Sequence, residues 1–239
     1  MTQSLQDQTV VVLGGSAGIG LATAKAAAAE GAAVIVTGRD HTRLEAAAKE
    51  IGAAGHAAFD STDTERLREF FWTLDEPVDH VLVSGGGPFY APLAGMDTAA
   101  ADHVAGHLQL YLEMAKLAAT SVRPGGAVLF IGGTGGRRPA VGLSVVALLT
   151  AGMPALARNL ALELAPVRVN LIAPGFVDTP LSASLLGDGL DARREELREK
   201  LPIRRVVAAE DVAAVAVHLM VNTALTGATF DVDGGQQLI

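Results

Sequence analysis

The sequence predicts a single α/β domain with a doubly wound, mostly parallel sheet of about seven strands. Short β-branched runs alternate with Ala-rich runs of helical period, which is typical of a parallel sheet with helices on both faces. The strand-like runs are apolar almost throughout, as strands buried on both faces are. No repeat, linker or low-complexity tract divides the chain, so residues 1–239 are expected to form one domain.

Six of the strands can be assigned to particular residues. In chain order they are 9–13, 33–37, 56–59, 80–83, 127–131 and 167–172. The helical runs between the first three end at Gly31 and Gly52, where a glycine predicts a helix stop. A further helix is expected within 141–164. There Pro154 predicts a bend or a restart, because proline lacks the N–H that would bond to the carbonyl of Thr150.

A charged stretch follows the sixth expected strand. Residues 188–201 predict a solvated helix capped by Asp188 or Asp191. Because it follows the sixth strand, the segment 180–201 would form a flap over a site at the end of the sheet. An exposed helix without a functional role is the alternative interpretation.

Composition excludes several function classes. Lys and Arg number 18 against 26 Asp and Glu, a formal net charge of −8 without any basic run, which argues against a nucleic-acid partner. The chain contains no cysteine, so disulfides, thiolate metal sites and a cysteine nucleophile are excluded. This composition fits a reducing cytoplasm, and the N-terminal residues lack the pattern of a signal peptide.

One window, residues 139–157, is uncharged and long enough to span a bilayer. Glycine, serine, threonine and proline interrupt it, and an amphipathic run follows it. The window therefore predicts a buried helix, or one at a subunit contact, and no membrane association.

A glycine-rich turn ends the first strand and opens the following helix. Gly14, Gly18 and Gly20 have the spacing G-x3-G-x-G in the segment VVVLGGSAGIG. Glycines at such a turn let the backbone approach a pyrophosphate, and the N–H groups and dipole at the helix start favour its negative charge. The turn predicts a dinucleotide site.

The end of the second strand bears on which dinucleotide is bound. NAD-binding folds place a carboxylate there, against the ribose hydroxyls. In this chain Gly38 occupies the position and Arg39 follows it. An arginine pairs with a 2′-phosphate, so the sequence favours NADP over NAD; a surface arginine opening a helix is the alternative.

Together these motifs resemble those of the short-chain dehydrogenase/reductase family over nearly the whole chain. The resemblance lies in GGSAGIG (14–20), FDST (59–62), VSGGG (83–87), VRVNLIAPGFVDTP (167–180) and the Asp-Gly-Gly signature at 233–235. It implies a Rossmann-type fold, a structural role for Asn170, and a cofactor site made of Gly14, Ser16, Gly18, Ile19, Gly20, Arg39, Asp60, Ser61, Ser84, Gly85, Gly86, Pro174, Gly175, Val177 and Thr179.

Two segments depart from the family pattern. Leu13 stands where a threonine is usual, and Ser84, Gly85 and Gly86 replace an Asn-Asn-Ala run. By resemblance, the uncharged helix within 141–164 is similar to the family's subunit contacts, which implies a homodimer or homotetramer.

The departures are greatest where the family places its catalytic residues. The resemblance implies a tyrosine, a lysine four positions later, a serine and an asparagine, which together handle the proton that accompanies hydride transfer. Alignment puts Val146, Thr150, Gly133 and His107 at these positions, so no catalytic residue is assigned. Tyr90 and Tyr111 have no Lys or Arg four residues later and are interpreted as packing residues.

Three functions remain open from the sequence. The first is an NADP(H)-binding protein without ordinary alcohol–ketone turnover. The second is an active reductase whose acid is Thr134, Ser144 or His107, with Arg137 or Arg138 supplying positive charge. The third is a non-catalytic structural or regulatory partner. His103 and His107 have metal-ligand spacing but no evident third ligand, so no metal site is predicted.

Overall fold

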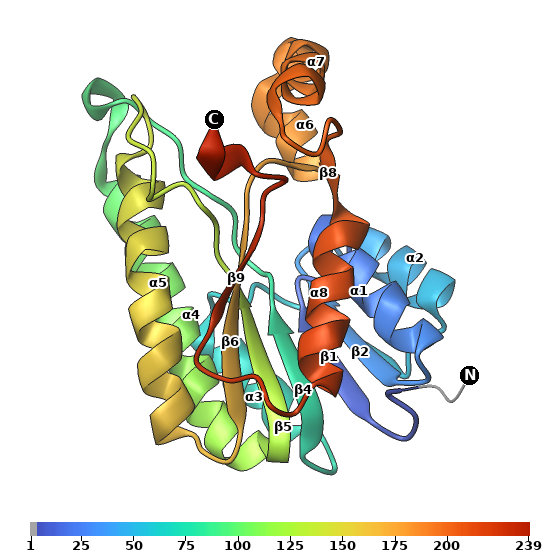
Figure 1. Cartoon of the computed structure of the whole chain (residues 1–239). Coiled ribbons are helices and arrows are strands. Elements are labelled where there is room, and N and C mark those ends of the chain that lie inside the picture. Colours follow the sequence, from blue (N-terminus) through green and yellow to red (C-terminus); the bar gives the residue numbers. More distant parts are fainter. Residues whose placement is uncertain (1–3) are drawn as a thin grey trace.

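A seven-stranded parallel sheet forms the centre of the computed structural model, which describes residues 4–239 (Figure 1). The strand order is β3-β2-β1-β4-β5-β6-β9. The strands are β1 (Thr9–Leu13), β2 (Ala33–Gly38), β3 (Gly55–Ala58), β4 (Val78–Val83), β5 (Val122–Ile131), β6 (Arg168–Pro174) and β9 (Thr229–Val232). A separate parallel pair, β7 (Val177–Asp178) and β8 (Val207–Ala208), lies above it. The predicted doubly wound sheet is confirmed.

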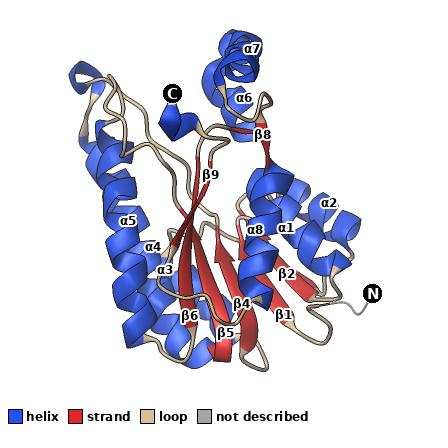
Figure 2. Ribbon diagram, in the orientation of Figure 1, coloured by secondary structure: helices blue, strands red, loops and turns tan. Residues whose placement is uncertain are grey.

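Helices cover both faces of the sheet (Figure 2). One face carries α1 (Gly18–Ala29), α2 (His41–Ile51) and α8 (Ala209–Val221), and the other carries α3 (Thr64–Trp72), α4 (Thr98–Ser121) and α5 (Ser144–Glu163). Beyond the carboxyl edge stand α6 (Pro180–Leu186) and α7 (Leu190–Lys200). Three short 3-10 turns are η1 (Leu93–Gly95), η2 (Gly187–Gly189) and η3 (Gln236–Leu238).

Alternate residues of the central strands enter two separate cores. In β1, Val11 and Leu13 pack on the α4 and α5 side, whereas Val10 and Val12 pack on the α1 and α8 side. Both faces of the strand are therefore buried, which explains why its sequence is apolar without alternation.

The six expected strands correspond to β1–β6, with ends that differ by at most two residues except at the start of β5, and the short pair β7 and β8 was not expected. The seventh strand, β9, was not assigned to residues, because it is short and only partly buried. The fifth strand begins at Val122 instead of residue 127, and its pairing with β4 shifts register between Val78 and His80. Gly125, with φ +83°, and Gly126 lie within this irregular part.

The helix α5 corrects one expectation. It continues from Ser144 to Glu163 through Pro154, so the predicted restart does not occur. Met153 and Ala157, on either side of the proline, are both buried, and this packing holds the helix together where its local sequence would break it. By length and composition alone, the helix could cross a membrane. In the structure it packs against β6 of the sheet, and 33% of the residues in its apolar window are buried.

The charged helix α7 begins later than predicted. Gly189 is its N-cap, and neither Asp188 nor Asp191 caps it by a side-chain hydrogen bond. Asp191 instead accepts a hydrogen bond from Arg194 one turn later, at 2.9 Å. The carboxylate is used in an ion pair, which explains why the capping prediction was wrong.

Asn170 has the predicted structural role. Its side chain is fully buried in β6, donates to the carbonyl of Leu225 (2.9 Å) and accepts from the N–H of Ala228 (3.1 Å). It thereby fixes the segment that leads into β9 against β6.

Candidate nucleotide-binding site

The glycine-rich turn after β1 packs directly against the end of β4. Gly14 has φ +90°, and a β-carbon on it would lie 2.9 Å from the backbone N of Gly85. A β-carbon on Gly20 would lie 2.1 Å from the carbonyl oxygen of Gly14. The hydroxyl of Ser84 donates to the carbonyl of Leu13 at 3.0 Å, so the two strand ends are also hydrogen-bonded. Only glycine allows this approach at positions 14 and 20.

The N-terminus of α1 has no side-chain acceptor for its first N–H groups. Its N-cap is Ala17, no side chain caps it, and its first turn contains no acidic residue. By contrast, Asp40, Asp63 and Asp97 cap α2, α3 and α4. The helices α5 and α7 also begin without a side-chain cap, so α1 differs in that its uncapped positive end lies beside the glycine-rich turn, where an external anion could be accepted.

Several predicted residues meet at the ends of β2, β3 and β4. A β-carbon on Gly38 would lie 3.0 Å from the hydroxyl of Ser16, and one on Gly85 would lie 2.3 Å from the hydroxyl of Ser61. Ser16 and Ser61 are both buried. The structure thus brings together residues that the sequence separates by more than twenty positions.

Arg39 lies at the exposed end of this group. Its side chain is 71% exposed, and its guanidinium is 3.8 Å from the carboxylate of Asp60. Asp60 also accepts hydrogen bonds from the N–H and the hydroxyl of Thr62, at 3.0 and 2.8 Å. The carboxylate is thus fixed by its own loop, whereas Arg39 retains the freedom to turn toward a ligand.

The segment after β6 closes the site from the other side. A β-carbon on Gly18 would lie 3.4 Å from the methyl group of Thr179, which places the start of α1 beside the start of α6. Thr179 is the N-cap of α6, and its hydroxyl accepts a long hydrogen bond from the N–H of Ser182 at 3.3 Å. Pro174 and Gly175 lie at the end of β6, between Thr134 and the C-terminal residues.

Two predicted cofactor residues turn their side chains toward the core. Val177 is buried in the cluster on the α1 and α8 side, and Ile19 packs against the same cluster. Val177 could therefore contact a ligand only through its backbone, whereas the side chain of Ile19 is still partly exposed.

The residues aligned with the catalytic positions also lie together. A β-carbon on Gly133 would lie 3.6 Å from the methyl group of Thr150, and one on Gly135 would lie 3.3 Å from a methyl group of Val146. Val146 is buried, and the hydroxyl of Thr150 donates to its carbonyl at 2.7 Å. The cluster is apolar apart from hydroxyl groups.

His107 approaches the same end of the sheet from α4. Its Nδ1 bonds to the carbonyl of His103 at 2.9 Å and must carry the proton there, because a carbonyl only accepts. A β-carbon on Gly86 would lie 2.2 Å from Nε2 of His107, so the glycine makes room for the ring.

The two histidines belong to a row of neighbouring rings that pack at tilted or edge-to-face angles. It runs through Phe89, His103, His107, Tyr111 and Phe130, with centroids 4.2 to 6.1 Å apart. Burial, and next the charge of His107, lower the pKa of His103. Burial raises the pKa of Tyr111 to about 12, which suits its predicted packing role and not proton transfer at neutral pH. Tyr90 is 51% exposed, so its predicted packing in the loop is only partial.

The other residues considered for proton transfer differ in their surroundings. Thr134 is buried and its N–H donates to the carbonyl of Pro174, whereas Ser144 is exposed at the start of α5. Arg137 forms a two-pronged ion pair with Asp231 of β9, with one N–O distance of 2.7 Å. Arg137 therefore does not carry the uncompensated charge considered from the sequence.

The C-terminal segment contributes a residue that the sequence did not reveal. The side-chain oxygen of Gln236 accepts a hydrogen bond from the N–H of Phe176 at 2.8 Å. The Asp-Gly-Gly signature just before it was the available signal, but its contact with residues 60 positions earlier could not be read from the sequence.

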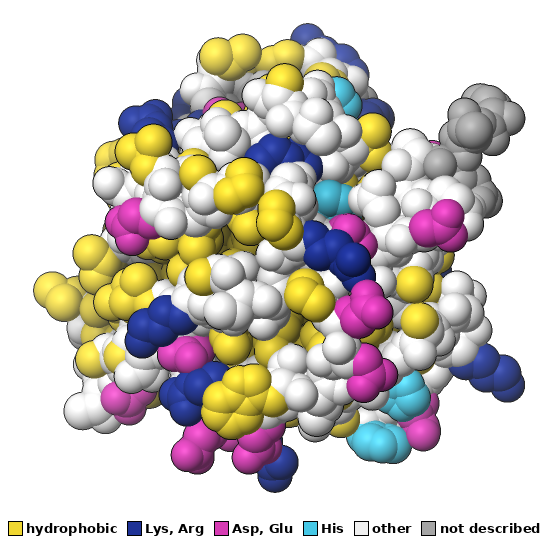
Figure 3. Space-filling model, turned by 90° about the horizontal axis from the view of Figure 1, so that it is seen from below, with side chains coloured by type: hydrophobic (Ala, Val, Ile, Leu, Met, Phe, Trp, Pro, Cys, Tyr) yellow, Lys and Arg dark blue, Asp and Glu magenta, His cyan; other side chains and the backbone are white. Residues whose placement is uncertain are grey.

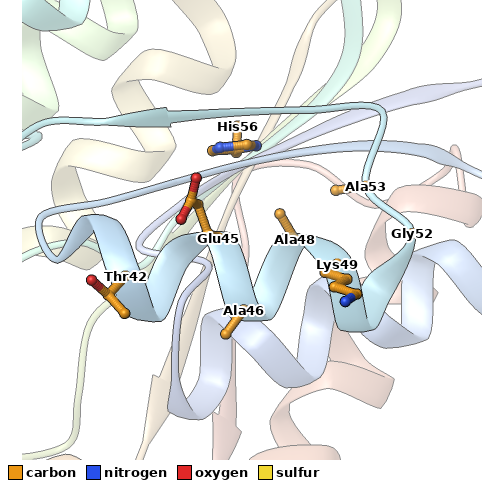
Figure 4. Close-up of a pocket in the computed structure, with 8 residues that line it drawn as sticks. All are labelled: Thr42, Glu45, Ala46, Ala48, Lys49, Gly52, Ala53 and His56. Carbon is orange, nitrogen blue, oxygen red and sulfur yellow. The ribbon is translucent and has the colours of Figure 1, made fainter.

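Neither of two hollows on the surface is lined by residues of the glycine-rich turn. The larger, between α2 and β3, is lined by Glu45, Lys49 and His56 among others, and Glu45 points toward His56 there (Figure 4). A smaller one lies beside Asp231 and Asp233. Within residues 4–239 no group of three His, Asp or Glu side chains is arranged to hold a metal ion.

Known proteins resemble this chain over nearly its whole length. Residues 14–237 match the family model described as enoyl-(acyl carrier protein) reductase. The chain is 30% identical to the short-chain dehydrogenase/reductase ATR9 of Stachybotrys chlorohalonatus, over 97% of this chain and 98% of that protein. It is 31% identical to a human 3-oxoacyl-[acyl-carrier-protein] reductase, over 98% and 99%.

Solved structures show the same fold. A small-chain dehydrogenase in complex with NADPH superposes with a TM-score of 0.83 at 28% identity, over 97% of this chain and 99% of that one. BdcA in complex with NADPH gives 0.84 at 26% identity, over 97% and 95%.

Proposed function

Because the chain belongs to the short-chain dehydrogenase/reductase family, we propose that it binds NADP(H) at the carboxyl edge of its sheet, with little or no ordinary alcohol–ketone turnover. The observation that carries the binding proposal is the uncapped N-terminus of α1 beside the glycines that pack against β4. A pyrophosphate there would accept from N–H groups that have no side-chain partner. NADPH complexes of two similar structures support the same ligand.

Arg39 is proposed to select NADP(H) over NAD(H). It follows β2 directly and is largely exposed, with one distant carboxylate as its partner. A guanidinium at this position would pair with the 2′-phosphate, which NAD lacks. Asp60 would hold the arginine near the ribose.

The second part of the proposal concerns the proton. Bound NADPH would supply a hydride, and the reduction of a ketone then requires a proton at the substrate oxygen. At the aligned positions Gly133 and Val146 have no ionisable group, and Thr150 gives its hydroxyl proton to a helix carbonyl. A hydroxyl without a neighbouring base is a poor acid, so turnover should be slow.

One observation favours a second candidate, an active reductase that uses His107. Its Nε2 lies next to Gly86, at the end of β4 where the ligand would pass, and its ring is held by the bond from Nδ1. Loss of activity in a His107→Gln variant that still binds NADPH would support this candidate.

We also propose that a second copy of the chain covers α4 and α5. Both helices expose leucines, namely Leu108 and Leu112 of α4 and Leu148 and Leu162 of α5. Both helices also carry few charged residues. Figure 3, seen from below, shows hydrophobic side chains gathered on the side where α5 lies in Figure 1. An apolar face of this kind is typical of a subunit contact.

Calorimetry with NADPH and NADH tests the binding proposal. We expect NADPH to bind more tightly, and Arg39→Ala to weaken NADPH binding by about ten- to a hundredfold while leaving NADH unchanged. Arg123→Ala removes the same charge at the opposite edge of the sheet and is the control. Binding of neither dinucleotide would contradict the proposal and favour a structural partner.

Turnover is measured separately on the same protein. A panel of ketones and activated double bonds should give no NADPH oxidation above the rate without substrate. Rapid ketone reduction would contradict the second part of the proposal but not the first.

A further inference from the structure

The C-terminal segment 233–238 lies against the loop that follows β6. The side-chain oxygen of Gln236 accepts from the N–H of Phe176, and the N–H of Gly175 donates to the carbonyl of Val232 at 3.2 Å. Figure 1 shows the C-terminus above β9, between the α6–α7 segment and the loops near α5. The last residues of the chain thus contact the segment that contains Pro174 to Thr179.

This C-terminal segment holds its own shape. Asp233 is buried, and its carboxylate accepts from the N–H groups of Gly235 (2.8 Å) and Gln237 (3.0 Å). Gly234 and Gly235 have φ of +65° and +84°, which side chains other than glycine rarely adopt. Gln236 is therefore presented to the loop in one orientation.

The loop is equally adapted to the contact. A β-carbon on Gly175 would lie 2.5 Å from the side-chain oxygen of Gln236 and 2.8 Å from the β-carbon of Asp233. Any side chain at this position would push the C-terminal segment away. Because Gly175 has no side chain, the side chain of Gln236 can reach the N–H of Phe176.

From this geometry we propose that Gln236 is a positioning residue for the dinucleotide, acting through the N–H of Phe176. The hydrogen bond fixes the start of the segment that ends at Thr179, whose methyl group packs beside Gly18 at the start of α1. Gln236 itself does not need to touch the ligand. The inference rests on the proposed function, because it takes the loop after β6 as one wall of the NADP(H) site.

Matched variants separate positioning from stability. Gln236→Met keeps the length of the side chain but removes the acceptor, whereas Gln236→Glu keeps an acceptor for the N–H of Phe176. Gln237→Met is the control, because the structure shows no hydrogen bond of the Gln237 side chain within residues 4–239. Three quantities are measured: NADPH affinity by calorimetry, the thermal midpoint, and hydrogen–deuterium exchange of the peptide covering 172–180 without ligand.

We expect Gln236→Met to bind NADPH about three- to tenfold more weakly, which is the loss of one ordinary hydrogen bond. Its peptide 172–180 should exchange faster, its thermal midpoint should stay near that of the parent, and Gln236→Glu should restore most of the affinity. Equal affinity of parent and Gln236→Met would overturn the inference while leaving the proposed function intact. Failure of the parent itself to bind NADPH would overturn both.

Discussion

At the scale of single residues, the structure shows that burial and not residue type decides the role of the histidines. His80 is 3% exposed at the amino end of the sheet, and its Nε2 is hydrogen-bonded to the side chain of Gln8 at 2.7 Å. Burial, and next the positive charge of Arg168, lower the pKa of His80 to about 4. From the sequence this histidine was only a residue near a strand start.

The lowered pKa predicts acid sensitivity. In the unfolded chain His80 titrates near 6.5, so the folded state favours the neutral ring, and the free energy of unfolding is highest above pH 6.5. It should decrease as the pH falls toward 4, by up to about 3 kcal/mol in total from this residue. Denaturant unfolding at several pH values measures this decrease.

Two variants make the assignment specific. His80→Gln keeps a partner for Gln8 without a titrating ring, so the fall in stability between pH 6.5 and 4 should become shallower. His56→Gln, at an exposed strand position, should leave the fall in stability between pH 6.5 and 4 unchanged. A parental pH dependence in His80→Gln would show that other groups cause it.

At the scale of elements, contacts between distant segments hold the α6–α7 segment in place. Arg194 of α7 forms two hydrogen bonds with Asp178 of β7, at 2.9 and 2.8 Å, and Arg193 lies 5.9 Å from the ring centre of Phe176. These contacts tie the proposed flap, residues 180–201, to the loop that would carry the dinucleotide. Its position after β6 was predicted, but its attachment was not.

Removing this tie should loosen the flap without unfolding the domain. Arg194→Met should speed hydrogen–deuterium exchange across residues 180–201 and lower the thermal midpoint only slightly, because a single ion pair that is still about one-third exposed contributes little stability. Arg198→Met, on the same helix, loses only a local pair with Glu195 and is the control. Equal exchange in the two variants would mean that Arg194 does not hold the flap.

At the scale of the whole molecule, the packing of a single chain does not explain why the outer surface of α4 and α5 exposes leucines. One face of each helix packs on the sheet through residues such as Met114 and Leu160, and the other exposes leucines. Exposed apolar patches on soluble proteins commonly mark contacts with another protein chain.

The proposed pairing predicts a change of mass on substitution. Leu148→Glu should convert the parent dimer or tetramer into smaller species, because it places a charge in an apolar contact. Light scattering after size-exclusion chromatography gives the mass. Trp72→Glu, which alters an exposed side chain on α3, should not change it. A parent that is already monomeric would refute the pairing.

The sequence by itself determined the features of this protein that depend on residues close together along the chain, namely its strands, its helices and its glycine-rich turn. Apolar periodicity indicated the strands and helices, and the glycine spacing at 14, 18 and 20 indicated a turn with close backbone approach. Such signals are local, since strand pleat, helix period and glycine conformation act over a few positions. The strands it did not assign, β7, β8 and β9, are two to four residues long and lack a long apolar run.

Tertiary structure alone decided which side chains meet. The pairing of Arg137 with Asp231 spans 94 positions, and the bond from Phe176 to Gln236 spans 60. The continuity of α5 through Pro154 likewise depends on packing against β6 and not on local propensity. Contacts between residues so far apart arise only when the sheet assembles, because strand order brings together chain segments that no local pattern connects.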